Sequence, residues 1–149
     1  MTLSVTHHPS TYYRESRHST LFGTRVSISG EAVQKSHNSN VGNLQQYISG
    51  ELAVAASRGD GVEELSPLKD GDGIYHRYFL LKPSNDRFGW RMVAFGEEDD
   101  FYISFRLTAM SEEDRKEGRA DFEKVVAAYR KDIDMCAVAR GRWRCDKSY

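Results

Sequence analysis

The residues of this sequence with the chemistry to bind a metal are its histidines and cysteines. The histidines are His7, His8, His18, His37 and His76. The cysteines, Cys136 and Cys145, lie near the C-terminal end with no histidine beside them. Structural zinc needs four nitrogen or sulfur ligands, usually in short paired spacings, and this pattern is missing. We therefore expect no metal and no cofactor, and we interpret His76 as an ordinary strand residue.

The segment Asp70-Gly71-Asp72-Gly73 resembles the start of a calcium-binding loop. It lacks the third oxygen ligand and the late glutamate that such a loop requires. Aspartate and glycine also tolerate the backbone angles of tight turns. The segment therefore predicts a turn between two strands.

Catalytic nucleophiles and cofactor-binding loops have recognisable sequence signatures. The chain has no G-x-S-x-G segment and no P-loop. Gly59-Asp60-Gly61 begins as a dinucleotide-binding loop begins, but the third glycine is missing. Neither cysteine has a predictable histidine partner. We therefore predict that the chain is not an enzyme and has no catalytic residues.

The strongest charged feature is the run Glu97-Glu98-Asp99-Asp100, between two predicted strands. One interpretation is a solvated turn that resists aggregation. The other is a patch that attracts a basic protein partner and raises its association rate. Tyr12, Tyr13 and Trp143 are candidate anchors for the same partner, because Tyr and Trp are enriched in interface hot spots. Core packing is the alternative for Trp143.

Length and composition limit the class of protein. The chain has 149 residues, 39% of them hydrophobic, and a net charge of −1. These values are typical of one soluble domain, 1–149, with an irregular arm over 1–20 and a basic tail over 134–149. The near-neutral balance and the few cations of the tail argue against nucleic-acid binding. No apolar run is long enough for a membrane span. The start lacks a secretory signal, and two late cysteines fit a reducing compartment, so we expect a cytoplasmic protein.

Hydrophobic spacing predicts the elements that position these residues. Even spacing predicts a strand over Leu21–Ile28, which Gly30 then interrupts. A helix is predicted over 43–57, with Asn43 as its N-cap and Gly59 at its end. A strand is expected over 62–68, leading to the turn at Asp70–Gly73. Three further strands, over 74–82, 88–95 and 101–108, are predicted to form an antiparallel meander because short turns join them.

A second helix is predicted to begin at Ser111 and to pack on the meander. Its apolar stripe is Phe122, Val125, Val126, Tyr129 and Ile133, and Gly118 is a point of interruption. In the strand before it, Tyr102, Ser104, Arg106 and Thr108 are expected to form a polar outer face. The fold class is therefore α+β.

The order of these elements from Asn43 to Arg130 resembles the PsbP-like superfamily, which includes Ran-binding Mog proteins, DcrB and LpqN lipoproteins and Eag secretion chaperones. The resemblance lies in the helix Asn43-Leu44-Gln45-Gln46-Tyr47, the strand Val62-Glu63-Glu64-Leu65, the meander and the closing Tyr129-Arg130 pair. It implies a single-domain α/β/α sandwich with a central antiparallel sheet. It supplies no catalytic residues, because most members of the superfamily are binding proteins.

Three functions remain open on these grounds. The first is an immunity protein that neutralises a bacterial secreted toxin, as in type VI secretion, in a one-to-one complex rather than as a homo-oligomer. The second is an Eag-like chaperone for an effector, which needs a long apolar groove. The polar outer face around Arg106 favours the first over the second. A small-ligand-binding or enzymatic domain is the third.

Overall fold

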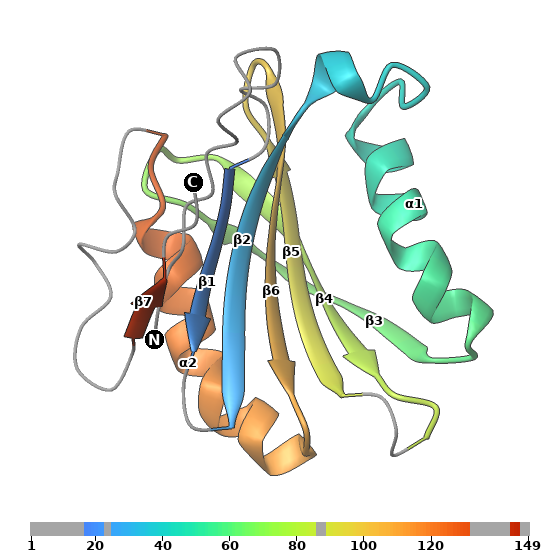
Figure 1. The fold of residues 1–149 in the computed structure, drawn as a ribbon, viewed down its shortest axis with the longest axis vertical. Helices are drawn as coiled ribbons and strands as arrows, with labels where there is room; N and C mark the ends of the chain where they lie inside the picture. The colour runs from blue at the N-terminus through green and yellow to red at the C-terminus, as the bar shows by residue number, and fades with distance from the viewer. Residues whose placement is uncertain (1–16, 23–24, 86–88, 132–143, 147–149) are drawn as a thin grey trace.

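The computed structural model describes residues 17–22, 25–85, 89–131 and 144–146 (Figure 1). Within these ranges the chain forms a mixed α+β fold with one seven-stranded sheet and two α-helices. The strands are β1 (Arg17–Phe22), β2 (Val26–Gln34), β3 (Gly61–Lys69), β4 (Tyr75–Lys82), β5 (Trp90–Glu97), β6 (Phe101–Ala109) and β7 (Arg144–Asp146). The helices are α1 (Leu44–Ser57), α2 (Glu112–Ala128) and the short 3₁₀-helix η1 (Lys35–His37). Of β1 and β7 only the backbone is described.

The strands lie in the order β3-β4-β5-β6-β2-β1-β7, and every neighbouring pair is antiparallel. The meander of β4, β5 and β6 is the one that the short turns predict, so that expectation is confirmed, and β3 is the strand expected over 62–68. On the other side of β6 lies β2, which comes from an early part of the chain and pairs with β6 along its full length, from Val26↔Ala109 to Gln34↔Phe101.

The prediction for the first strands was wrong in its boundaries. Instead of one strand over Leu21–Ile28, the chain forms β1 and β2, which pair as a hairpin. Gly30 does not interrupt β2. It lies opposite Phe105, and a Cβ at Gly30 would be 3.0 Å from the Cε1 atom of that ring. The missing side chain therefore makes room for an aromatic ring in the core.

Helix α1 begins and ends as predicted. The side chain of Asn43 accepts a hydrogen bond from the backbone N–H of Gln46 at 2.9 Å, which satisfies one donor of the first turn. The helix ends at Ser57 with Arg58 as its C-cap, and Gly59 follows with a φ of 79°, a conformation that favours glycine. The buried side of the helix carries Tyr47 and Ile48.

Helix α2 is capped by Ser111, whose hydroxyl accepts from the N–H of Asp114 at 3.1 Å. Gly118 does not interrupt it, contrary to the prediction. A Cβ there would be 3.0 Å from both Leu107 and Val26, so the glycine lets the helix lie close to the sheet. The helix ends at Ala128, which leaves Tyr129 in extended backbone just beyond it. The last residue of the predicted stripe, Ile133, lies outside the described residues.

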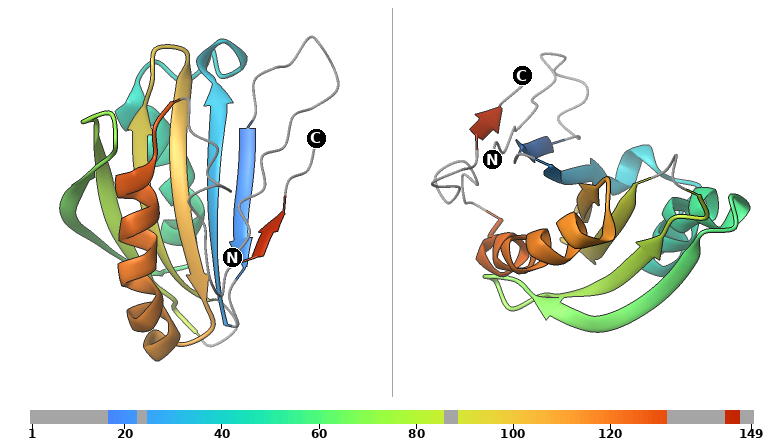
Figure 2. Two further views of the ribbon diagram at one scale, coloured as in Figure 1. Left: turned by 90° about the vertical axis from the view of Figure 1, so that its left-hand side faces the viewer. Right: turned by 90° about the horizontal axis from the view of Figure 1, so that it is seen from below.

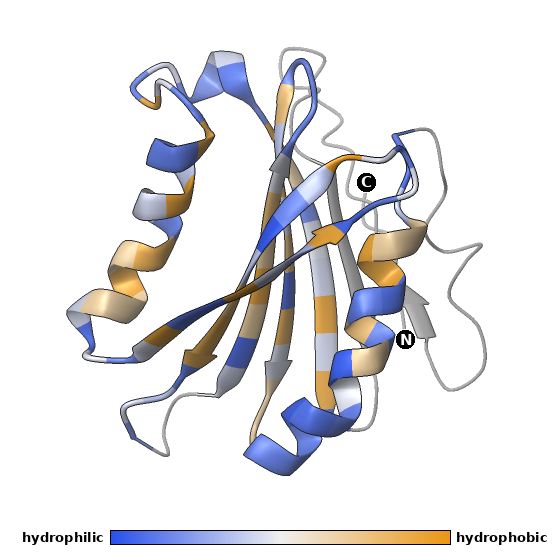
Figure 3. Ribbon diagram, turned by 180° about the vertical axis from the view of Figure 1, so that it is seen from behind, coloured by the Kyte–Doolittle hydropathy of each residue, from blue (hydrophilic) through white to orange (hydrophobic). Residues whose placement is uncertain are grey.

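The two helices cover opposite faces of the sheet, because alternate residues of each strand enter different hydrophobic clusters. On the α2 side the cluster contains Ile28, Tyr78, Met92, Phe105, Leu107, Phe122 and Val126, among others. On the α1 side it contains Ile48, Ala55, Phe79, Leu81, Val93 and Phe95. The sheet curves around α2, as the view from below shows (Figure 2). The first half of α2 is hydrophilic, and its second half supplies the apolar contacts (Figure 3).

Candidate functional site

The acidic tip, defined here as Glu97, Glu98, Asp99 and Asp100, lies at the turn between β5 and β6. The backbone N–H of Glu98 donates to the carbonyl of Phe101 at 2.8 Å and closes this turn. The structure therefore brings the four predicted residues together on one hairpin. The other predicted contact residues, Tyr12, Tyr13 and Trp143, lie outside the described residues.

Half of the acidic tip is used to attach the hairpin to the rest of the molecule. The ammonium of Lys35 lies 2.8 Å from Glu97 Oε2, and the backbone N–H of Lys35 donates to the carbonyl of Asp100 at 2.9 Å. On the other side, the hydroxyl of Tyr129 donates to Glu98 Oε1. Lys35 is the first residue of η1, directly after β2, and Tyr129 directly follows α2. The side chains of Asp99 and Asp100 are exposed at the end of this anchored turn.

A buried Asp–His pair lies in the β3–β4 hairpin. Nε2 of His76 lies 2.8 Å from Oδ2 of Asp70, and both side chains are almost completely buried. The other oxygen of Asp70 accepts from the N–H groups of Asp72 and Ile74, at 2.8 and 3.0 Å. The predicted turn is confirmed, and His76 is a strand residue as expected. The sequence interpretation missed their contact, which an aspartate in a turn six residues before a strand histidine could have suggested.

This pair does not form a catalytic triad within the described residues. A triad needs a nucleophile that bonds to the second ring nitrogen of the histidine. Nδ1 of His76 is buried and has no partner there, and the ring lies against the backbone of Gly96. The pair therefore holds the hairpin together.

A group of polar side chains lies on the α1 side of β2 and β6. This surface, called here the polar face, consists of Ser27, Ser29, Glu31, Ser104, Arg106 and Thr108. Helix α1 packs over β3 to β5, so no α-helix of the described residues covers the polar face over β2. Tyr102 was expected on the same outer face but is buried. Its ring stacks on that of Tyr47 with centroids 4.8 Å apart, because α1 reaches this end of β6.

Beside the polar face lies a buried carboxylate shared by two arginines. Oδ2 of Asp60 accepts from Arg58 Nη2 at 2.8 Å and from Arg91 Nη2 at 3.4 Å. Oδ1 of Asp60 accepts from the backbone N–H of Ser84 at 2.9 Å. Burial alone would raise the pKa of Asp60, but the hydrogen bonds from Arg58 and Ser84 outweigh it and hold that pKa below its usual value. Asp60 is therefore ionised and joins the end of α1 to β4 and β5.

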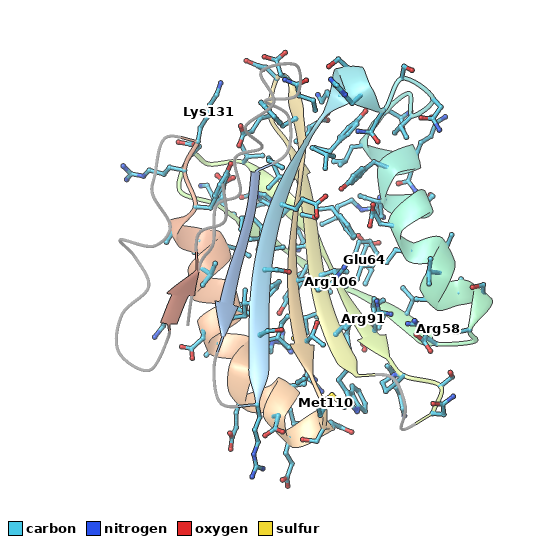
Figure 4. All side chains as sticks on the ribbon, viewed as in Figure 1. Arg58, Glu64, Arg91, Arg106, Met110 and Lys131 are labelled. Atoms are coloured by element: carbon cyan, nitrogen blue, oxygen red, sulfur yellow. The ribbon has the colours of Figure 1, made fainter. Side chains whose placement is uncertain are left out.

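Arg106 has a different environment from Arg58. Its closest carboxylate oxygen, Glu51 Oε2, is 3.7 Å from Nη2, beyond hydrogen-bonding distance. Its Nε is buried and has no partner among the described residues. Burial and the neighbouring positive charges of Arg58 and Arg106 lower the pKa of Arg91. Figure 4 shows the three arginines in one row across β6, β5 and the end of α1.

The carboxylates of Glu31 and Glu51 also lie near Arg106. Burial raises the pKa of Glu51, and the negative charge of Glu31 adds to this, while Arg106 opposes it. Burial and the charge of Glu51 also raise the pKa of Tyr47, although a hydrogen bond with Ser104 opposes the shift. Arg106 therefore lies near two groups of opposite charge, the carboxylates of Glu31 and Glu51 and the guanidinium groups of Arg58 and Arg91.

Metal sites and membrane spans are two further classes of feature that side-chain chemistry and helix composition can indicate. Within the described part of the chain, no group of three or more histidine, cysteine, aspartate or glutamate side chains is arranged to hold a metal ion. None of the helices in that part is both long enough and apolar enough to cross a membrane. In comparisons with known proteins, no family model matches the sequence, and no curated protein matches it either.

Proposed function

We propose that this chain is a non-catalytic cytosolic binding protein that neutralises a bacterial secreted toxin by direct one-to-one binding. The observation that supports the proposal is the acidic tip, which is attached to the rest of the molecule from two sides and still presents two carboxylates. Lys35 and Tyr129 tie it down from two sides, and Asp99 and Asp100 project into solvent. The resemblance to a superfamily of binding proteins points the same way.

An anchored turn has an energetic advantage in binding. A loop that is already ordered loses less conformational entropy when a partner docks. Charges at the edge of an interface act mainly on the association rate, which falls as salt screens them. Asp99 and Asp100 therefore suit the capture of a toxin that carries a basic surface.

The test is a co-expression experiment with the product of the neighbouring gene. The proposal predicts that this product stops bacterial growth and that co-expression of the chain restores growth. It also predicts a one-to-one complex of the purified proteins in size-exclusion chromatography. A neighbouring product that is harmless, or that forms no complex with the chain, contradicts the proposal.

A matched pair of variants tests the role of the tip. Asp99→Ser with Asp100→Ser should lower the association rate about tenfold at low salt and much less at high salt. Glu113→Ser with Glu117→Ser removes the same charge from exposed positions of α2, which begins at the opposite end of the molecule (Figure 1). This control should bind as the original chain does. Equal rates for all three proteins would contradict the role of the acidic tip while leaving the complex itself intact.

A further inference from the structure

Arg106 is a cation whose hydrogen-bonding capacity is unused within the described residues. A guanidinium group has five N–H donors. Those of Arg106 make no hydrogen bond there, since Glu51 is 3.7 Å away and Nε is buried without a partner. By contrast, Arg77 on the same side of the sheet donates two hydrogen bonds to Glu64, both at 2.9 Å. The contrast singles out Arg106 as a donor without an acceptor.

Arg91 lies close to Arg106, and its positive charge is also only partly balanced by a carboxylate. It pairs with Thr108 across β5 and β6, whereas Arg106 pairs with Val93, so the two arginines are diagonal neighbours on the same face. Long side chains at diagonal positions are within reach of each other. Among the described residues, the carboxylate that Arg91 contacts is Asp60, at 3.4 Å, and Asp60 already has a shorter bond from Arg58. Neither Arg91 nor Arg106 therefore has a carboxylate to itself at hydrogen-bonding distance, since Asp60 is shared and Glu51 is 3.7 Å from Arg106.

Hydroxyl groups complete the surroundings. Ser29 lies opposite Arg106 on β2, and Thr108 lies opposite Arg91 on β6. Both side chains belong to the polar face and are half-buried. Hydroxyls can donate as well as accept, so this side of Arg106 is rich in donors. Glu31 lies opposite Ser104, on the other side of Arg106 from Thr108, and Glu51 Oε2 approaches Arg106 Nη2 to 3.7 Å.

We infer that Arg91 and Arg106, with the hydroxyls of Ser29 and Thr108, form a binding site for the phosphate group of a ligand. Arginine pairs bind phosphate through several charge-assisted hydrogen bonds, and phosphate offers enough acceptor oxygens for both guanidinium groups and the hydroxyls. A carboxylate offers fewer acceptor sites than phosphate and a smaller negative charge, so it matches two guanidinium groups and two hydroxyls less well. The inference concerns the chain alone and does not rest on the proposed toxin partner.

The test measures binding of inorganic phosphate to the full chain by calorimetry and by the NMR signals of arginine Nε–H groups. Phosphate should shift the Nε–H signal of Arg106, and Arg106→Gln should weaken phosphate binding about tenfold or more, as expected for lost charge-assisted bonds. Arg77→Gln, the matched control, removes the same charge from the same side of the sheet and should bind phosphate as the original chain does. Thermal denaturation checks that Arg106→Gln is folded, which we expect because Arg106 makes no hydrogen bond to lose.

Other outcomes would overturn the inference. One is an absence of phosphate binding, and another is equal affinity in the original chain and Arg106→Gln. Equal losses in Arg106→Gln and Arg77→Gln would show that phosphate responds only to net charge. Acetate at matched ionic strength forms the second arm of the experiment. Acetate binding as tight as phosphate binding would overturn the assignment of phosphate as the ligand group.

Discussion

The ring of His76 lies against Gly96 on the neighbouring strand, so closely that a Cβ at Gly96 would be 2.6 Å from Nδ1. Asp70 holds the other side of the ring, and His76 is only 1% exposed. The imidazole therefore has little freedom to move away. Glycine at this position of β5 is a requirement of the buried pair and not a sign of a flexible turn.

Gly96→Ala should destabilise the protein by about 1–3 kcal/mol, as expected for a side chain forced into a packed interior. The control is Gly50→Ala on α1, where a Cβ would meet no atom within 4 Å. That change should stabilise the helix by up to about 1 kcal/mol, because alanine has the higher helix propensity. Urea denaturation measures the free energy of unfolding of both variants. A loss of stability in Gly50→Ala, or none in Gly96→Ala, would contradict the geometry described.

Asp70→Ala should destabilise the protein by about 3 kcal/mol, since it removes the acceptor of three hydrogen bonds and leaves the buried Nε2 of His76 without a partner. Asp72→Ala is the comparison. Its side chain accepts one exposed bond, from the backbone N–H of Lys131 at 2.8 Å. We expect a cost below about 1 kcal/mol there. Chemical denaturation of the two variants should show this order, and the reverse order would refute the structural role of the pair.

Asp60→Asn should destabilise the protein at neutral pH by about 3 kcal/mol, because two arginines lose their shared carboxylate. The effect should depend on pH. The pKa of Asp60 is lower in the folded protein, so its stabilising contribution is complete above the ordinary aspartate pKa of about 3.9. It is lost as the pH falls through the lower folded value.

The measurement is the unfolding free energy of the original chain and Asp60→Asn from pH 7 to pH 2.5. The difference between the two should be constant down to about pH 5 and should shrink below about pH 4. A difference that stays the same at every pH would mean that Asp60 contributes through its shape and not through its charge.

Local signals in the sequence account for most of the elements that were predicted correctly. Asn43 and Ser111 cap their helices because short polar side chains satisfy the first N–H groups, and that depends on neighbours along the chain. The meander follows from short turns. The predictions that Gly30 and Gly118 interrupt their elements were wrong, because each glycine makes room for a side chain that is distant in sequence.

The candidate site was predictable only in part. Alternation along β6 places Arg106 on the polar side of that strand, as expected. Nothing in the sequence indicates that Arg91 becomes its diagonal neighbour or that Asp60 is shared by two arginines, because these contacts depend on strand register and on where α1 ends. The acidic tip was predicted as one group, but its attachment to Lys35 and Tyr129 depends on η1 and on the end of α2.

The pairing of β2 with β6 has a consequence for the order of folding. Between these adjacent strands the chain must first pass through α1 and three other strands. Closing so long a loop is entropically unfavourable until the contacts that reward it exist. The β3–β6 hairpins involve only near neighbours, so we expect them to form before β2 docks. Early protection from hydrogen exchange should therefore appear at Phe79 and Val93, and later protection at Ile28.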